Sequence, residues 1–216
     1  MPLTKQEAEA RICAARVVAV LTLDAEADAL PVADALIAGG IRAIELTLRT
    51  PEAAACLRRI AAERPQLLVG AGTVLTAEQL RLALEAGAAF AVSPGLNHAV
   101  SAEAEKIGLP YFPGVMTPTD VETALAMGHR LLKFFPAEMA GGVKMLKALA
   151  APYAQAGVRF FPLGGINVDN ARQYLDLPVV AAIGGSWIAE RPLIQAGRFD
   201  EIAARAAAAC RLALCS

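Results

Sequence analysis

Residues 41–74 read IRAIELTLRTPEAAACLRRIAAERPQLLVGAGTV, and this stretch holds the unit from which the whole chain is built. Its two ends, Ile41–Leu48 and Leu67–Val74, are short runs dominated by apolar and β-branched side chains. The residues between them are rich in Ala and Arg, the composition of an amphipathic helix with a solvated edge. Nearly apolar strands joined by helices are typical of a parallel sheet that helices cover.

The same alternation continues in both directions from this stretch, and it predicts eight strands. They are Val17–Leu23, Ile41–Leu48, Leu67–Val74, Ala89–Pro94, Leu109–Val115, Leu131–Phe135, Arg159–Leu163 and Val179–Gly184. Thr76 and Thr119 are predicted to begin two of the helices, and glycines such as Gly108 to end others.

Eight strand–helix units in one short chain predict the fold class and the domain organisation. We expect α/β structure with a single domain over residues 1–216, a (β/α)8 TIM barrel with an extra N-terminal helix at about residues 3–16. A doubly wound open sheet is the alternative. No G-x-G-x-x-G follows the first predicted strand, which argues against a dinucleotide-binding fold.

Composition excludes several classes of protein. With 56% hydrophobic and 19% charged residues, the chain is too apolar for intrinsic disorder. A net charge of -1 and 5% aromatic residues give no sign of a nucleic-acid surface, so none is expected as a partner. No apolar run reaches the roughly 18 residues of a membrane span, and no signal peptide is visible. The four cysteines form no C-x-x-C pair, which favours a cytoplasmic protein without zinc or disulfides.

Polar side chains on the second predicted strand share one face. Side chains of a strand alternate between its two faces, so Glu45, Thr47 and Arg49 point one way and Ile44 and Leu46 the other. The apolar set suits the helix layer, which leaves the polar set inside the barrel and at its mouth. In such barrels the chemistry lies at the carboxyl ends of the strands.

One lysine interrupts the sixth predicted strand, whose sequence is Leu131-Leu132-Lys133-Phe134-Phe135-Pro136. Inside an apolar barrel a lysine loses hydration, which disfavours its charged form. A neutral amine can attack a ketone and form a Schiff base, and Glu45 could carry the protons of that reaction. The alternative is a buried Lys133–Glu45 ion pair that takes part in no chemistry.

Glycine pairs follow the last two predicted strands and form a second, independent signal. Backbone amides at these two positions are the usual phosphate cradle of an α/β barrel, and a serine hydroxyl can add one more donor. The predicted phosphate site therefore consists of Gly164, Gly165, Gly184, Gly185 and Ser186. Neither histidine is assigned to the site: His98 and His129 are both expected at the surface.

Several of these segments together resemble one known family. Glu45-Leu46-Thr47-Leu48-Arg49-Thr50, Gly70-Ala71-Gly72-Thr73-Val74, Ser93-Pro94-Gly95, Pro113-Gly114-Val115, Lys133-Phe134-Phe135-Pro136-Ala137-Glu138 and Gly184-Gly185-Ser186-Trp187 occur in the order that the family shows. The chain resembles the bacterial 2-keto-3-deoxy-6-phosphogluconate (KDPG) aldolases, which overlap with the 4-hydroxy-2-oxoglutarate (KHG) aldolases.

The resemblance implies a class I, metal-independent aldolase of the Entner–Doudoroff pathway that needs no cofactor. Its substrate would be a phosphorylated keto-deoxy sugar acid, cleaved to pyruvate and glyceraldehyde 3-phosphate. By this likeness Lys133 is the Schiff-base lysine and Glu45 the general acid/base. Arg49 and Thr73 would bind the pyruvate carboxylate, and Pro94 and Phe135 would enclose its methyl group. Family members are usually homotrimers.

The chain departs from the family at Leu163. Where the members that cleave the phosphogluconate derivative usually have Pro-Thr-Gly-Gly, this sequence has Pro162-Leu163-Gly164-Gly165. Loss of the threonine hydroxyl removes a hydrogen bond worth roughly 0.5–1.5 kcal/mol beside the aldehyde half of the substrate. Leu163 is therefore predicted to affect specificity, with the C4 epimer (the galactonate derivative) or 4-hydroxy-2-oxoglutarate as alternative substrates.

Two other classes of function compete with the aldolase. One is a different phosphate-handling barrel, such as an epimerase or a thiamine-phosphate synthase, but the strands carry neither a metal-binding His/Asp set nor an acidic magnesium site. The other is a non-catalytic subunit that binds phosphosugars. Such a subunit would have no use for a desolvated lysine opposite an acid.

Overall fold

The computed structural model describes residues 3–214, which form an α/β structure around a curled parallel sheet. Every strand pair is parallel, as the nearly apolar strands predict. The strands are β1 (Val17–Leu21), β2 (Ala43–Thr47), β3 (Leu68–Gly72), β4 (Phe90–Val92), β5 (Tyr111–Phe112), β6 (Gly114–Val115), β7 (Leu131–Phe134), β8 (Arg159–Pro162) and β9 (Ile183–Gly185).

Two groups of paired strands make up the sheet. The larger has the order β5-β4-β3-β2-β1-β9 and the smaller the order β6-β7-β8. At one junction only Pro113 separates β5 from β6, and at the other single β-bridges join Phe160 to Val180 and Leu163 to Gly184. Consecutive strands are therefore neighbours all along the sheet.

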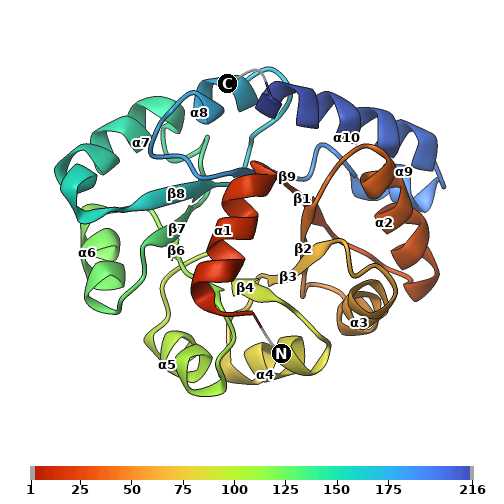
Figure 1. Ribbon diagram of the computed structural model, residues 1–216, viewed down its shortest axis with the longest axis horizontal. Helices are drawn as coiled ribbons and strands as arrows, with labels where there is room; N and C mark the ends of the chain where they lie inside the picture. Colours follow the sequence, from red (N-terminus) through yellow and green to blue (C-terminus); the bar gives the residue numbers. More distant parts are fainter. Residues whose placement is uncertain (1–2, 215–216) are drawn as a thin grey trace.

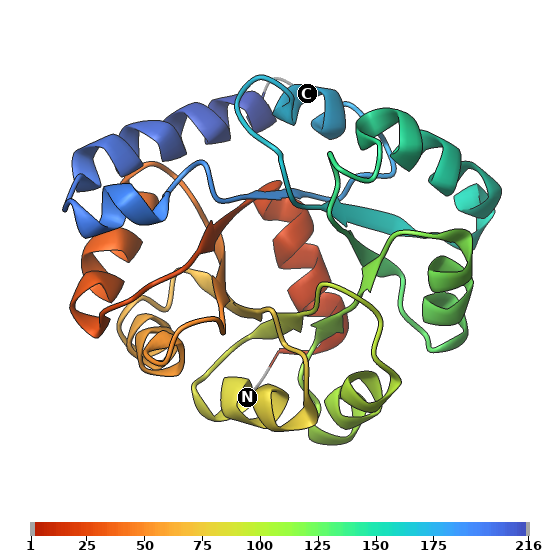
Figure 2. The same ribbon diagram turned by 180° about the vertical axis from the view of Figure 1, so that it is seen from behind.

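Helices surround the sheet on the outside, and one helix lies across its open end. Figure 1 shows α1 in front of the strands, and Figure 2, from behind, shows the strands in front of α1. The helices are α1 (Lys5–Ala15), α2 (Ala29–Ala38), α3 (Ala53–Glu63), α4 (Ala77–Glu85), α5 (His98–Ile107), α6 (Pro118–Ala126), α7 (Gly142–Ala150), α8 (Ala171–Leu175), α9 (Arg191–Gln195) and α10 (Phe199–Leu214), with 3-10 turns at Glu26–Asp28 and Ala151–Ala156. Within residues 3–214, no helix is both long and apolar enough to cross a lipid bilayer.

The core is divided into an inner and an outer part by the alternation of side chains along each strand. The inner part contains Ala8 and Ile12 of α1 together with strand residues such as Ala43 and Leu131. The outer part lies between the strands and the surrounding helices, and Ile44 and Leu46 belong to it. The predicted parity of the second strand is therefore confirmed, because Glu45 must face inward with Ala43.

Two strand predictions need correction. The fifth strand does not run unbroken from Leu109 to Val115: Pro113 has no N–H, and the chain changes partner there from β4 to β7. The last strand begins at Ile183 and not at Val179, since only one bridge, at Val180, precedes it.

The predicted start of α6 is also wrong, whereas the start of α4 at Thr76 is confirmed. Helix α6 begins two residues earlier than Thr119 implies, with Thr117 as its N-cap. The Thr117 hydroxyl accepts a hydrogen bond from the Asp120 N–H at 3.2 Å, and Asp120 Oδ2 accepts one from the Thr117 N–H at 2.9 Å. This reciprocal capping box satisfies two backbone donors, which explains why the helix begins there.

Candidate active site

A hollow of about 230 Å³ lies at the carboxyl ends of the strands and brings most of the predicted site residues together. Its position agrees with the general placement of chemistry in barrels of alternating strands and helices. Its lining consists of Val20, Glu45, Thr47, Arg49, Lys133, Phe135, Leu163, Gly164, Gly165, Ile166, Gly184, Gly185 and Ser186.

Lys133 and Glu45 form a buried pair at the floor of this hollow. Lys133 Nζ lies 2.9 Å from Glu45 Oε1 and 3.2 Å from Oε2. Their side chains are only 6% and 1% exposed. The ammonium and the carboxylate thus replace each other's hydration, which is the condition under which a buried charge is tolerated. The same contact gives a direct path for a proton from the amine to the carboxylate.

Gly72, at the end of β3, makes room for the Glu45 carboxylate. A Cβ atom at this position would overlap the Glu45 side chain, so a residue larger than glycine would displace the acid. The next residue, Thr73, has a φ of 58°, a left-handed conformation that is a genuine outlier for a β-branched side chain. Such strain is concentrated at functional sites, although it does not itself define one.

Arg49 follows β2 and lies exposed at the mouth of the hollow. Its Nη2 is 3.4 Å from the Thr22 hydroxyl, a long hydrogen bond. Within residues 3–214 no carboxylate forms an ion pair with this guanidinium. The mouth therefore offers a positive group to an anionic ligand.

Two glycine-containing segments also line the hollow. Gly164 and Gly165 have φ values of 96° and 82°, which favour glycine, and a Cβ on Gly165 would overlap Glu138. The carbonyl oxygens of this loop accept hydrogen bonds from the Glu138 N–H at 3.0 Å and from Asn170 Nδ2 at 3.1 Å. Those bonds fix the loop from behind, so that its N–H groups are not needed to hold it in place.

The second segment, Gly184-Gly185-Ser186, consists of the last two residues of β9 and the residue that follows them. A Cβ on Gly185 would overlap the Trp187 ring, which packs beside this segment. Leu163, the residue after β8, contacts it, because a Cβ on Gly184 would overlap the Leu163 side chain. Leu163 is 4% exposed and occupies the space between the two glycine loops.

The structure does not bring every predicted residue into the hollow, and it adds others. Thr73 and Pro94 lie at the ends of β3 and β4 but are not among the lining residues. Thr47 and Ile166 do line it, and the inward parity of Glu45 was a sufficient signal for Thr47. Ile166 lies in a loop, where no periodicity indicates the direction of a side chain.

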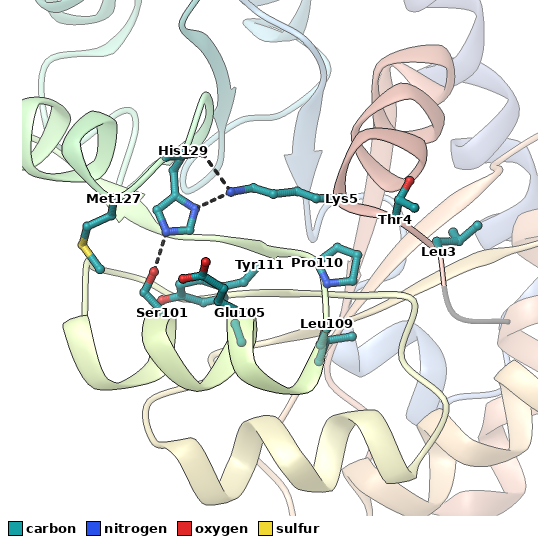
Figure 3. A pocket seen from close by; sticks show the side chains of 13 residues that line it. Leu3, Thr4, Lys5, Ser101, Glu105, Leu109, Pro110, Tyr111, Met127 and His129 are labelled. Atoms are coloured by element: carbon teal, nitrogen blue, oxygen red, sulfur yellow. Dashed lines mark hydrogen bonds between the residues drawn. The ribbon is translucent and has the colours of Figure 1, made fainter.

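A second hollow, of about 540 Å³, lies at the opposite ends of the strands, between α1, α5 and the start of β7. Figure 3 shows His129 between Lys5 and Ser101 at its wall. His129 is 4% exposed, so the prediction that it lies at the surface is wrong. Burial lowers its pKa to about 4, and the nearby Lys5 charge adds to this shift.

The arrangement around His129 is unsuited to activating a serine. Lys5 Nζ lies 3.0 Å from His129 Nδ1, and an ammonium can only donate. The proton of the neutral ring is therefore on Nε2, which donates to Ser101 Oγ at 2.5 Å. A ring nitrogen that already holds a proton cannot remove one from the hydroxyl. His129 instead connects α1 and α5 to the strand end.

In the part of the chain that the structure describes, His, Cys, Asp and Glu side chains do not gather in threes where they could hold a metal ion.

Comparison with known proteins identifies the family. A family model described as KDPG and KHG aldolase matches residues 8–205. The chain belongs to the KDPG and KHG aldolase family. The resemblance drawn from the sequence motifs is thus confirmed.

Individual aldolases of this family match over nearly the full length. The 2-dehydro-3-deoxy-phosphogluconate aldolase of Haemophilus influenzae is 46% identical over 202 residues, or 94% of each chain. The crystal structure of the KDPG aldolase of Legionella pneumophila, with pyruvate captured as a covalent carbinolamine intermediate, is 41% identical, with a TM-score of 0.89 over 93% of this chain and 97% of that one.

A third aldolase carries a phosphorylated ligand. The crystal structure of the 2-keto-3-deoxy-6-phosphogluconate aldolase of Zymomonas mobilis with 3-phosphoglycerate is 40% identical, with a TM-score of 0.86 over 95% of this chain and 96% of that one.

Proposed function

We propose that this protein is a class I aldolase that cleaves 2-dehydro-3-deoxy-6-phosphogluconate to pyruvate and D-glyceraldehyde 3-phosphate. The observation that carries the proposal is the buried contact of 2.9 Å between the Lys133 amine and the Glu45 carboxylate. Family membership and the names of the most similar aldolases support the same reaction.

In this reaction Lys133 is the nucleophile and Glu45 is the general acid and base. Glu45 accepts a proton from the Lys133 ammonium, and the neutral amine attacks the C2 carbonyl to form a carbinolamine. Glu45 gives this proton to the carbinolamine hydroxyl, which leaves as water, and Glu45 so becomes a carboxylate again. The resulting iminium withdraws electrons from the C3–C4 bond. Glu45 removes the C4 hydroxyl proton, the C3–C4 bond breaks, and the aldehyde leaves with an enamine remaining on Lys133. Protonation of C3 and hydrolysis of the imine then release pyruvate.

The remaining predicted residues hold the two ends of the substrate. Arg49 at the mouth binds the keto-acid carboxylate together with Thr73, the residue after β3, and Phe135 and Pro94 enclose the methyl group that C3 becomes. Thr73 and Pro94 do not line the hollow in this structure, so these two roles rest on the resemblance to the family. At the other end the phosphate is bound by backbone N–H groups and a hydroxyl. The phosphate-binding residues are Gly164, Gly165, Gly184, Gly185 and Ser186.

Leu163 supports a second candidate for the substrate, which differs from the first in its aldehyde half. Its apolar side chain occupies the space between the glycine loops, where it offers no hydrogen bond to a substrate hydroxyl. The same imine chemistry would accept the galactonate-derived epimer or 4-hydroxy-2-oxoglutarate. Leu163 thus decides among substrates of one reaction, not among reactions.

The proposal includes the architecture and setting in which the reaction takes place. We infer a closed (β/α)8 barrel of one domain over residues 1–216, with α1 as the extra N-terminal helix covering one end. The junction at Pro113 and the bridges between β8 and β9 support closure. The enzyme would act as a cytoplasmic homotrimer in the Entner–Doudoroff pathway. Sedimentation equilibrium tests the trimer, which a monomeric mass would exclude.

The chemical proposal is tested by trapping the imine. Incubation with pyruvate and borohydride should add one reduced pyruvyl group to the peptide that contains Lys133. The Lys133→Arg variant, which keeps a cation opposite Glu45 but lacks the amine, serves as the control and should acquire none. Labelling of another lysine, or phosphosugar binding without any adduct, would instead favour a non-catalytic binding protein.

A further inference from the structure

Three polar side chains and one carbonyl form a directed chain of hydrogen bonds from the site mouth into β1. Thr47 Oγ1 lies 3.0 Å from the Leu21 carbonyl oxygen and 2.9 Å from Thr22 Oγ1. Arg49 Nη2 lies 3.4 Å from the same Thr22 oxygen. These contacts join β2 to the end of β1, and the family motifs quoted above do not include Thr22.

The direction of each proton in this chain follows from its ends. A carbonyl oxygen can only accept, so the Thr47 hydroxyl donates to Leu21. The proton between the two threonines must then come from Thr22, which donates to Thr47 Oγ1 at 2.9 Å. Thr22 is left with its lone pairs facing outward, and a guanidinium can only donate to them. The arrangement therefore requires a hydrogen-bond donor at this point, and the Arg49 guanidinium supplies it.

Arg49 benefits from such a contact because its exposed side chain can otherwise adopt many rotamers. Its side chain is exposed and has no ion-pair partner in the described part of the chain, and an unrestrained arginine loses substantial rotamer entropy when it is immobilised. Thr22 lies in an adjoining hollow of about 360 Å³ whose lining also includes Arg49 and Ser186. A hydrogen bond from this side restricts the guanidinium before a ligand arrives, which increases affinity by lowering the entropic cost of binding.

We propose that Thr22 is a positioning residue that orients the Arg49 guanidinium toward the carboxylate of the bound keto acid. The proposal rests on the proposed function, since it requires a keto acid on Lys133. Thr22 touches no reacting atom. Its effect is on the binding of an α-carboxylate and not on the rate at which the amine attacks a carbonyl.

The experiment compares borohydride trapping on Lys133 with two ketones, pyruvate and the uncharged acetone. For Thr22→Val, which keeps the shape and removes the hydroxyl, the half-saturating pyruvate concentration should rise about 2- to 10-fold with the same maximal adduct. The acetone dependence should not change, because acetone has no carboxylate. Thr22→Ser should restore the wild-type pyruvate dependence. Thr50→Val is the matched control. The Thr50 hydroxyl lies in the same adjoining hollow but donates to the Leu23 carbonyl and not to Arg49.

Three results would overturn the proposal while leaving the aldolase function intact. They are an unchanged pyruvate dependence in Thr22→Val, an equal shift for pyruvate and acetone, and an equal shift in Thr50→Val. A wild-type protein that forms no adduct on Lys133 would overturn the proposed function itself and this inference with it. The two failures are thus distinguished by the behaviour of the unmodified chain.

Discussion

At the scale of single residues, the site depends on charged side chains whose burial without a partner would destabilise the fold. Lys133 and Glu45 are buried charges that are tolerated because they lie in contact. Removing one partner of such a pair leaves the other charge buried and uncompensated, which is far more costly than removing both. This asymmetry separates the structural role of the pair from its chemical role.

The variant Lys133→Met is expected to lose about 3–5 kcal/mol of unfolding free energy, because the Glu45 carboxylate stays buried without its cation. The double variant Lys133→Met/Glu45→Leu should recover most of this loss. Neither variant should cleave substrate. Urea unfolding monitored by circular dichroism measures the stabilities, and a double variant no more stable than the single one would contradict this account.

Leu163→Thr is expected to shift specificity toward the gluconate-derived substrate. The new hydroxyl can bond the aldehyde half, so the kcat/KM ratio of the gluconate- to the galactonate-derived phosphate should rise about 2- to 10-fold. Leu163→Val, which has nearly the shape of threonine but no hydroxyl, is the control. If both variants give the same ratio, the effect comes from volume and not from hydrogen bonding.

At the scale of elements, the positions of helices and strands are set by local chemistry that also shapes the site. Reciprocal capping boxes begin α1, α4 and α6. Gly72 ends β3 beside Glu45 and leaves room for the carboxylate. One short residue in one strand thus decides where the side chain of the neighbouring strand can lie.

The capping of α6 predicts different effects for two threonines that lie two residues apart. Thr117→Ala should lower the unfolding free energy by about 1 kcal/mol, because the Asp120 N–H loses its acceptor. Thr119→Ala should change it by less than about 0.5 kcal/mol, since the Thr119 side chain caps nothing. Equilibrium unfolding of the two variants decides whether the helix begins where the structure places it.

At the scale of the whole molecule, the two ends of the curled sheet have different tasks. One end carries the amine, the guanidinium and the glycine loops. The other end is covered by α1, whose Lys5 donates to His129 and to the Gly128 carbonyl at 3.1 Å. Strand β7 connects the two ends, because His129 lies just before it at one end and Lys133 lies within it toward the other.

The buried His129 predicts a loss of stability in acid. Its pKa is lowered to about 4 in the folded protein, whereas the unfolded chain takes up the proton near 6.5. Between these values the unfolded state binds more protons, so the unfolding free energy should fall as the pH drops from about 6.5 to about 4.

Unfolding curves across this pH range test the prediction, with each 1 kcal/mol corresponding to about 2–4 °C in Tm. His129→Gln, which cannot titrate, should show a smaller decrease over the same range. A wild-type curve that is flat between pH 6.5 and 4 would contradict the role of His129.

The sequence by itself determined the parts of the structure that depend on local patterns. Strand positions, the inward parity of Glu45 and the isolated lysine at position 133 all follow from alternation and hydropathy within a few residues. The glycine pairs were visible for the same reason, because each stands at the end of an apolar run, and of these glycines only Gly164 and Gly165 adopt the left-handed conformation. These features account for most of the candidate site.

Only the tertiary structure decided which side chains of distant strands meet inside the curled sheet. Lys133 and Glu45 are 88 positions apart, and Lys5 and His129 are 124 apart. No local pattern specifies such contacts, because they depend on how the sheet curls and on where α1 lies. Burial of His129, the change of partner at Pro113 and the bond between Thr22 and Arg49 therefore emerged from packing, in which residues distant in the chain exclude water together.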